Sequence, residues 1–184
     1  MTSHRPDIAV IGAGYVGLAT ALGFLELGFP VRLVENDPAR LSSLLLGNCS
    51  VQEPRLRELL EKHLHRKLHL TGSLNDVTSS KFVFVCVGTP SASDGSSDVS
   101  AVYSVLKYLS EASDSPQVWI LKSSVPPGTT RKLCNDLNLS CDRLVVNPEF
   151  LRKGHCIDDF MFPPRIVVGA CVPEVAAVVS DLFF

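Results

Sequence analysis

Short apolar runs alternate along this chain with longer stretches in which apolar residues recur at helical spacing. The short runs predict strands, and the longer stretches predict helices. The expected strands are Ile8–Ile11, Val31–Glu35, Phe82–Val87, Val118–Leu121, Leu144–Val146 and Ile166–Val168. The expected helices are Tyr15–Leu27, Pro38–Leu46, Pro54–His65, Val99–Glu111, Thr129–Leu137 and Pro173–Leu182. Most strand candidates are continuously apolar, which is typical of strands covered on both faces. The pattern therefore predicts an α/β fold with a doubly wound, mostly parallel sheet and helices on both faces.

Length and charge narrow the class of protein. The chain has 184 residues, of which 46% are hydrophobic, so a single domain spanning residues 1–184 has enough apolar sequence for its own core. Its 17 basic and 19 acidic residues leave a net charge of −2. Because that balance does not attract a phosphate backbone, we expect no nucleic acid as a partner.

One stretch has the length of a membrane span. Ile8–Leu25 contains eighteen residues without a charge, close to what crossing a bilayer requires. Four glycines interrupt it, and it begins with a strand-like run. We interpret it as a strand, a glycine turn and a buried helix, and expect no membrane as a partner.

Six cysteines raise the question of disulfides or a metal. They form no C-x-x-C pair, and none lies near histidines with metal-ligand spacing. Cys86 and Cys171 lie inside apolar runs, where a free thiol behaves as a small core residue. We expect buried, reduced cysteines, no metal site and a cytoplasmic location.

A glycine-rich turn carries the strongest local signal for chemistry. Gly12, Gly14 and Gly17 form a G-x-G-x-x-G pattern that follows one expected strand and opens one expected helix. Glu35 closes the next strand, eighteen residues beyond Gly17. In a Rossmann-type domain these glycines permit the tight turn, the approach of a pyrophosphate and close helix–strand packing, while the helix N-terminus attracts the anion. The sequence therefore predicts a dinucleotide-binding site.

Glu35 also bears on which dinucleotide binds. A carboxylate accepts hydrogen bonds from both ribose hydroxyls and repels a 2′-phosphate, which favours NAD over NADP. Arg40, five residues further on, argues for NADP if it faces the ribose. Otherwise it is a solvated helix residue or one that rests over the adenine. We expect NAD as the cofactor.

Three further polar segments follow expected strands, namely Val87–Pro90, Lys122–Thr130 and Val146–Gly154. Each alone is consistent with turn chemistry, because Gly and Pro mark turns and Ser or Thr caps helices. Together they place hydroxyl groups and the carboxylate of Glu149 at one rim of the sheet. An open parallel sheet binds its ligand at that rim.

With these motifs in this order, nearly the whole chain resembles the nucleotide-sugar 6-dehydrogenases, of which UDP-glucose 6-dehydrogenase is the best-known activity. The resemblance is carried by G-x-G-Y-V-G at Gly12–Gly17, Glu-Pro at Glu53–Pro54, V-C-V-G-T-P at Val85–Pro90, D-G-S at Asp94–Ser96, K-S-S-V-P-P-G-T at Lys122–Thr129, N-P-E-F-L-R at Asn147–Arg152 and P-x-R-I-V-V-G at Pro163–Gly169. It implies that the C6 alcohol of a UDP-sugar, with UDP-glucose favoured, is oxidised to a carboxylate while two NAD molecules each take a hydride.

The resemblance also implies roles for individual residues. Thr89 and Ser124 line the nicotinamide side, and Glu149 assists proton transfer through water, so Glu149 and Ser124 are the expected catalytic residues. Taken alone, Glu149 is also explained as an acid stabilised at a helix start. The expected cofactor-binding residues are Gly12, Gly14, Tyr15, Val16, Gly17, Glu35, Arg40, Gly88, Thr89, Ser124 and Lys153. The expected substrate-binding residues are Glu149, Phe150, Leu151, Arg152 and Lys153.

Departures from the family pattern limit what the resemblance implies. Ser124 stands where Thr is usual, and Lys153 stands where a second Glu is common, which reverses a charge and puts that contact in doubt. The family's nucleophilic cysteine motif, its uridine-binding residues and its dimer-forming helix belong to later parts of the chain, and none occurs in these 184 residues. Without that thiol the second oxidation has no covalent intermediate.

Three hypotheses follow. The first is the cofactor-binding half of a UDP-sugar dehydrogenase, inactive when isolated. The second is a free-standing NAD-binding module or pseudoenzyme. The third, a dehydrogenase of another β-hydroxyacid type, is disfavoured by the N-P-E-F-L-R segment. The oligomeric state and the identity of the sugar are left open.

Overall fold

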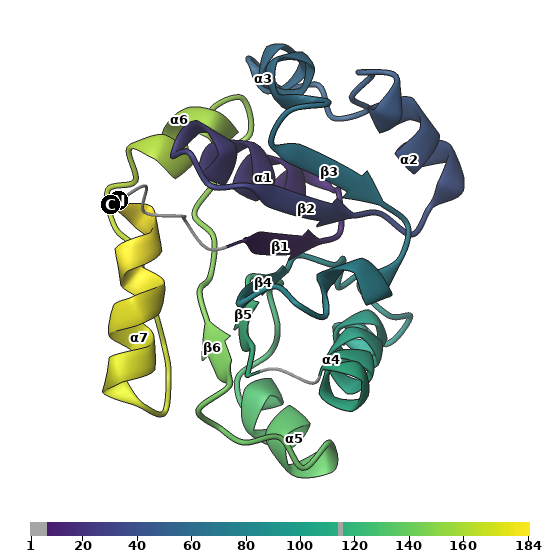
Figure 1. Cartoon of the computed structure of the whole chain (residues 1–184). Coiled ribbons are helices and arrows are strands. Elements are labelled where there is room, and N and C mark those ends of the chain that lie inside the picture. Colours follow the sequence, from purple (N-terminus) through teal and green to yellow (C-terminus); the bar gives the residue numbers. More distant parts are fainter. Residues whose placement is uncertain (1–6, 114–115) are drawn as a thin grey trace.

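Six parallel strands form one sheet. The computed structural model describes residues 7–113 and 116–184, so the first six positions of the expected domain 1–184 lie outside the described residues, as do residues 114–115. The strands are β1 (Ile8–Ile11), β2 (Val31–Val34), β3 (Leu68–Thr71), β4 (Phe82–Val85), β5 (Val118–Leu121) and β6 (Leu144–Val146). Their order is β3-β2-β1-β4-β5-β6 (Figure 1). This is the strand order of the doubly wound Rossmann sheet, so the predicted fold class is confirmed.

Helices connect the strands and cover both faces of the sheet. The α-helices are α1 (Tyr15–Glu26), α2 (Pro38–Leu45), α3 (Leu56–His63), α4 (Ser100–Ala112), α5 (Thr129–Asp136), α6 (Cys156–Met161) and α7 (Pro173–Ser180), and two short 3-10 helices are η1 (Leu74–Val77) and η2 (Asp181–Phe183). The start of α2 shows why the local sequence forms a helix there. The Asp37 side chain accepts hydrogen bonds from the N–H groups of Ala39 and Arg40, and Pro38 occupies the first turn. All six expected helices are present, and α6 is an addition.

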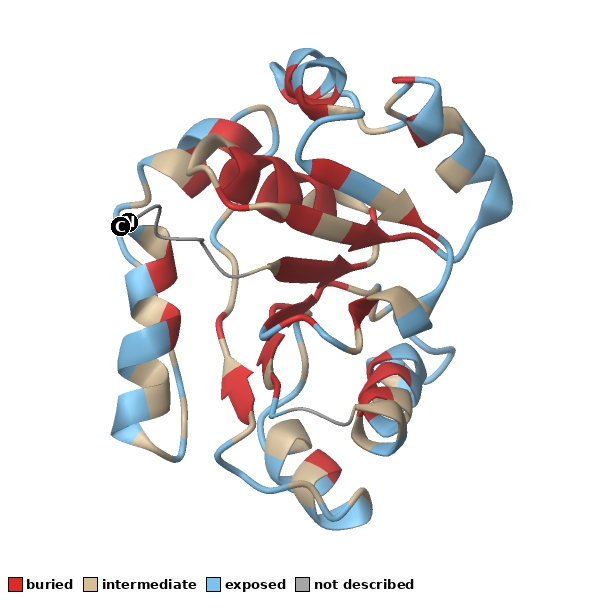
Figure 2. Cartoon of the chain, viewed as in Figure 1, coloured by how far each residue is buried: buried red, intermediate tan, exposed pale blue. Residues whose placement is uncertain are grey.

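Alternate side chains of each strand enter two separate cores. Ile8 and Val10 of β1 pack with α1, α2, α3, α6 and the C-terminal helices, whereas Ala9 and Ile11 pack with η1, α4 and α5. Figure 2 shows the central strands buried along their whole length. β1 and β4 are continuously apolar because neither face of the sheet meets water there.

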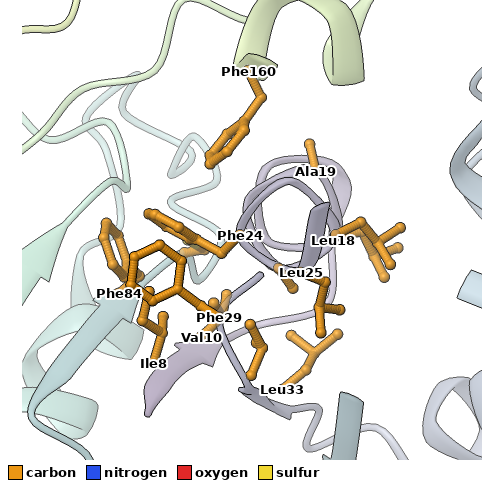
Figure 3. Close-up of a cluster of buried hydrophobic side chains, with 14 of the residues drawn as sticks. Ile8, Val10, Leu18, Ala19, Phe24, Leu25, Phe29, Leu33, Phe84 and Phe160 are labelled. Atoms are coloured by element: carbon orange, nitrogen blue, oxygen red, sulfur yellow. The ribbon is translucent and has the colours of Figure 1, made fainter. Parts of the chain in front are cut away.

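Phe24 of α1 lies at the centre of the first core. It is fully buried, and its ring centroid lies 4.9–5.7 Å from those of Phe29, Phe84, Phe160 and Phe183. Figure 3 shows Phe160 reaching from α6 toward α1, beside Phe24. This aromatic cluster therefore joins α1 to β4, α6 and η2, and it holds the helix that begins at the glycine turn.

The prediction of a strand at Ile166–Val168 is wrong. Only Gly169, just beyond it, makes a bridge to the sheet, an antiparallel one with Val146. The carbonyl of Val167 instead accepts a hydrogen bond from Nδ2 of Asn147 at 2.8 Å. Because a side chain engages this carbonyl, the segment runs beside β6 without extending the sheet.

Strand β3 is absent from the sequence-based expectations. Leu68–Thr71 is short, and only its end residues are buried, whereas His69 is exposed and Leu70 is half-buried. It is paired with β2 in the register Val31↔Leu68 to Val34↔Thr71. The pairing partner, rather than the local pattern, therefore makes this segment a strand.

The uncharged stretch Ile8–Leu25 forms β1, the glycine turn and most of α1, as expected. None of the helices in the described part of the chain has the length and apolar character that a membrane crossing needs.

Candidate cofactor-binding site

The glycine turn between β1 and α1 has a shape that only glycine permits at two positions. Gly12 has φ +99°, and a Cβ there would lie 2.8 Å from the carbonyl oxygen of Cys86. A Cβ on Gly17 would lie 1.7 Å from the carbonyl oxygen of Gly12. The turn and the first helical turn are thus packed directly against each other and against the end of β4.

Gly14 is different, because a Cβ there would meet nothing within 4 Å. It is the N-cap of α1 and provides no side-chain acceptor for the free N–H groups of the first helical turn. Open space in front of unpaired N–H groups at a helix N-terminus is the arrangement that binds a diphosphate. The residues present therefore fit a dinucleotide.

Glu35 is buried and holds the glycine turn to β2. Its carboxylate is 2% exposed and accepts hydrogen bonds from the N–H of Ala13 at 3.1 Å and of Asp37 at 2.9 Å. Arg40 donates to the same carboxylate at 3.0 Å. Because a carboxylate has about four acceptor positions, these three donors leave one position without a partner for a hydroxyl group. Arg40 thus pairs with Glu35, an arrangement the sequence did not indicate.

We expect Glu35→Gln to weaken both folding and cofactor binding. The amide would present an NH₂ group where the carboxylate accepts, leaving buried donors unpaired at a cost of about 1–3 kcal/mol in unfolding free energy. Loss of the charged acceptor should lower NAD affinity about tenfold. Denaturant unfolding and calorimetric titration with NAD and NADP measure these effects, with Glu58→Gln on the exposed face of α3 as control. Unchanged NAD affinity would contradict the assignment of Glu35.

The loops after β4 and β5 meet α1 at the carboxyl end of the sheet. They surround a hollow of about 240 Å³. Two hydrogen bonds join the loops: Oγ1 of Thr89 donates to the Ser124 carbonyl at 2.8 Å, and Oγ of Ser123 donates to the Val87 carbonyl at 2.7 Å. The residues around this hollow are Gly14, Tyr15, Val16, Cys86, Val87, Gly88, Thr89, Lys122, Ser123, Ser124 and Glu149. We call it the crevice hollow.

Glu149 lies in the crevice hollow and also in a second cavity beside Phe150 and Leu151. Its Oε2 accepts a hydrogen bond from the N–H of Leu151 at 2.6 Å, which closes a tight turn at the start of the segment. Glu149 is half-buried and is one of the residues that line the crevice hollow. The expectation that Glu149 shares a rim with Thr89 and Ser124 agrees with this placement.

Side chains from distant elements hold the segment 149–154 in place. The hydroxyl of Tyr15 donates to the Arg152 carbonyl at 2.7 Å, and both carboxylate oxygens of Glu53 lie 2.8 Å from the N–H of Gly154. Burial raises the pKa of Tyr15 to about 12, with a further contribution from Glu53, so the hydroxyl remains a donor. The segment is thereby fixed relative to the glycine turn.

The side chain of Arg152 pairs with Asp159. Their closest oxygen–nitrogen distance is 2.7 Å, and the guanidinium hydrogen bonds lower the pKa of Asp159 to about 2. Lys153 lies in a neighbouring hollow of about 570 Å³ with Tyr15, Glu53 and Leu151. Thr89 and Ser124 line the crevice hollow, and Tyr15 borders both hollows.

The cysteines do not all lie in the core. Cys86 and Cys156 are buried, and burial raises the pKa of each thiol to about 12, so neither is a ready nucleophile. Cys171, in the turn before α7, and Cys141, before β6, are exposed, so the expectation of burial is wrong for both. Cys49 and Cys134 are half-buried. Cys171 was expected to be buried because it lies in an apolar run. Its apolar neighbours belong to a connecting segment and not to a strand.

Sequence reasoning missed the pair Lys122 and Asn147, both buried at the ends of neighbouring strands. Nζ of Lys122 donates to Oδ1 of Asn147 at 3.0 Å. A lysine directly after the apolar run Val118–Leu121 was the available signal, because lysine is rarely buried without a specific partner.

The strand order, the glycine turn with its open helix N-terminus and the acid at the end of β2 define a Rossmann-type dinucleotide-binding domain. Residues 6–184 match the UDP-glucose/GDP-mannose dehydrogenase family, NAD binding domain. The chain belongs to this family, and NAD is its cofactor.

Known relatives extend the match at the levels of sequence and structure. UDP-glucose 6-dehydrogenase of Pseudomonas aeruginosa is 36% identical over 186 residues, covering 96% of this chain and 41% of the relative. A UDP-glucose dehydrogenase from Pyrobaculum islandicum superposes with a TM-score of 0.89 at 33% identity, covering 99% of this chain and 44% of that one. GDP-mannose dehydrogenase of P. aeruginosa, solved as a ternary complex, superposes with a TM-score of 0.88 at 26% identity, covering 96% and 43%. The chain thus spans about two-fifths of the length of these relatives.

Proposed function

We propose that this chain is the NAD-binding half of a dehydrogenase that oxidises the C6 alcohol of a UDP-sugar to a carboxylate, using two NAD molecules. The observation that carries the proposal is the crevice hollow, where Gly14, Thr89, Ser124 and Glu149 meet at the carboxyl ends of the strands. Of the three relatives described above, the two with the higher sequence identity, 36% and 33%, are UDP-glucose dehydrogenases, which favours UDP-glucose as the sugar nucleotide.

Each part of the crevice has a task in this reaction. NAD would supply the acceptor for the hydride that leaves the alcohol carbon. The N–H groups at the start of α1 would bind its diphosphate, and Glu35, with Arg40 beside it, would bind its adenosine ribose. Loss of a hydride from an alcohol requires loss of a proton as well, and the Glu149 carboxylate would pass that proton to water.

The segment after β6 would form one wall for the sugar. Phe150 and Leu151 line the cavity next to Glu149. Arg152 would contribute through its backbone, because its guanidinium is engaged by Asp159. Lys153 would face the neighbouring hollow. At this position the family commonly has a glutamate, so the charge here is positive instead of negative.

The isolated 184-residue chain should bind NAD and show no UDP-glucose oxidation. Burial keeps the thiols of Cys86 and Cys156 protonated. The other four cysteines, Cys49, Cys134, Cys141 and Cys171, are not among the residues that line the crevice hollow, so no reactive thiol is placed there for a covalent intermediate. Calorimetry with NAD, and NADH absorbance with UDP-glucose and NAD present, check the two parts of this prediction. Turnover by the pure chain would overturn the proposed inactivity, and failure to bind NAD would overturn the assignment itself.

The sugar nucleotide is tested in a chimera. This chain would replace the matching part of the P. aeruginosa UDP-glucose 6-dehydrogenase, which supplies the remaining length. We expect NAD-dependent oxidation of UDP-glucose, and its loss on Glu149→Gln. Oxidation of GDP-mannose in preference to UDP-glucose would contradict the proposed substrate.

A further inference from the structure

Lys122 places a buried positive charge at the end of β5. Its side chain is 5% exposed. Among the described residues, Nζ has one hydrogen-bond acceptor, Oδ1 of Asn147 at 3.0 Å. Burial lowers the pKa of Lys122, and the carboxylate of Glu149 opposes that shift. The hydrogen bond to Asn147 and the nearby carboxylate both stabilise the charged form of the amine.

Lys122 and Glu149 are the charged residues among those that surround the crevice hollow. The other two titratable groups there, the hydroxyl of Tyr15 and the thiol of Cys86, have pKa values raised to about 12 by burial and are neutral. The side-chain charges around the hollow are therefore one ammonium on one strand end and one carboxylate on the next loop, in addition to the partial positive charge at the start of α1.

The fold indicates which end of the dinucleotide occupies the crevice hollow. The diphosphate lies at the start of α1, and Glu35 at the end of β2 binds the ribose on the adenine side. The other half of the dinucleotide must then extend over the ends of β4 and β5, on the opposite side of β1. The loops that follow those strands, with Thr89 and Ser124, surround the hollow that contains Lys122.

We propose that Lys122 makes this site bind the reduced cofactor more tightly than the oxidised one, and that Glu149 acts in the opposite direction. The nicotinamide ring carries a positive charge in NAD and none in NADH. A buried ammonium in the same hollow repels only the charged ring, and a carboxylate attracts only the charged ring. Because water is largely excluded around Lys122, screening of this interaction is weak.

The inference rests on the proposed function, since it needs the nicotinamide end in the crevice hollow. Tighter binding of NADH than of NAD makes the bound oxidised cofactor a stronger oxidant, by thermodynamic linkage. That bias suits an enzyme that removes a hydride from an alcohol. Lys122 acts here as a positioning charge and does not exchange a proton with substrate.

The test is the ratio of the dissociation constants for NAD and NADH, measured on the 184-residue chain at one pH and ionic strength. Calorimetry measures both constants, and NADH fluorescence provides a check on the second. In Lys122→Met we expect the ratio of Kd(NAD) to Kd(NADH) to fall about tenfold. Lys122→Arg keeps the charge and should keep the ratio near that of the wild type.

Two further variants distinguish an electrostatic effect on the ratio of the dissociation constants from a structural effect of the substitution. Glu149→Gln should raise the ratio, and it provides the same test if Lys122→Met does not fold. Lys107→Met, an exposed lysine on α4, should leave the ratio unchanged. A structural role for Lys122 would weaken both cofactors equally, so an unchanged ratio in Lys122→Met or Glu149→Gln overturns the inference. Absence of binding of either cofactor to the wild type would instead overturn the proposed function.

Discussion

Gly17→Ala is expected to reduce NAD affinity about 100-fold, which corresponds to about 2.8 kcal/mol of binding free energy at about 1.4 kcal/mol per tenfold. A Cβ at this position would lie 1.7 Å from the carbonyl oxygen of Gly12. The backbone of the turn has to move, because neither atom belongs to a flexible side chain. The N–H groups that face the diphosphate move with it. Overpacking of this kind should also lower the free energy of unfolding by about 1–3 kcal/mol.

Gly14→Ala is the matched comparison. Its Cβ would meet nothing within 4 Å, and the φ of −77° suits alanine. We expect a stability change below about 1 kcal/mol, from the weaker N-cap. NAD affinity should nevertheless fall strongly, because the added methyl group occupies the space for the diphosphate. Calorimetric titration and thermal unfolding of both variants separate the two effects. Wild-type NAD affinity in Gly14→Ala would show that the diphosphate does not lie there.

Phe24→Ala is expected to lower the free energy of unfolding by about 3–5 kcal/mol. The side chain is fully buried, and its ring contacts four other phenylalanine rings. Removal leaves a cavity where α1, β4, α6 and η2 meet, and the surrounding rings come from separate elements that cannot all move inward. The melting temperature should fall by roughly 6–20 °C for a domain of this size.

Phe162→Ala is the control for that substitution. Phe162 is 79% exposed, just after α6, so the same change of residue type should alter stability by no more than about 0.5 kcal/mol. Denaturant unfolding without cofactor compares the two variants directly. Equal effects would mean that the aromatic cluster around Phe24 does not hold α1 in place.

Much of the fold follows from local sequence. The central strands are recognisable because strands buried on both faces must be apolar at every position, as at Phe82–Val85. Helix starts are recognisable because Asp37 and Pro38 supply the cap and the fixed backbone angle that a helix start needs. The glycine turn is recognisable because its conformation excludes other residues at Gly12 and Gly17.

Edge segments of the sheet do not follow from local sequence. Leu68–Thr71 is a strand because β2 provides a partner along its whole length. Ile166–Val168 has stronger strand propensity and is not a strand, because Asn147 engages its carbonyl. Pairing at a sheet edge depends on which backbone groups remain available, and that depends on distant parts of the chain.

For the candidate site, the sequence by itself determined the kinds of groups present: a glycine turn, an acid after β2, hydroxyls after β4 and β5, and a carboxylate after β6. Tertiary structure alone decided how they are held. Tyr15 bonds to the carbonyl of Arg152, 137 residues away, and Lys122 bonds to Asn147, 25 residues away. A motif identifies which functional groups are present because each function depends on a particular type of residue, such as a carboxylate or a glycine. Contacts between groups arise only when strands far apart in the sequence become neighbours in the sheet, and burial then determines the charge that each group presents.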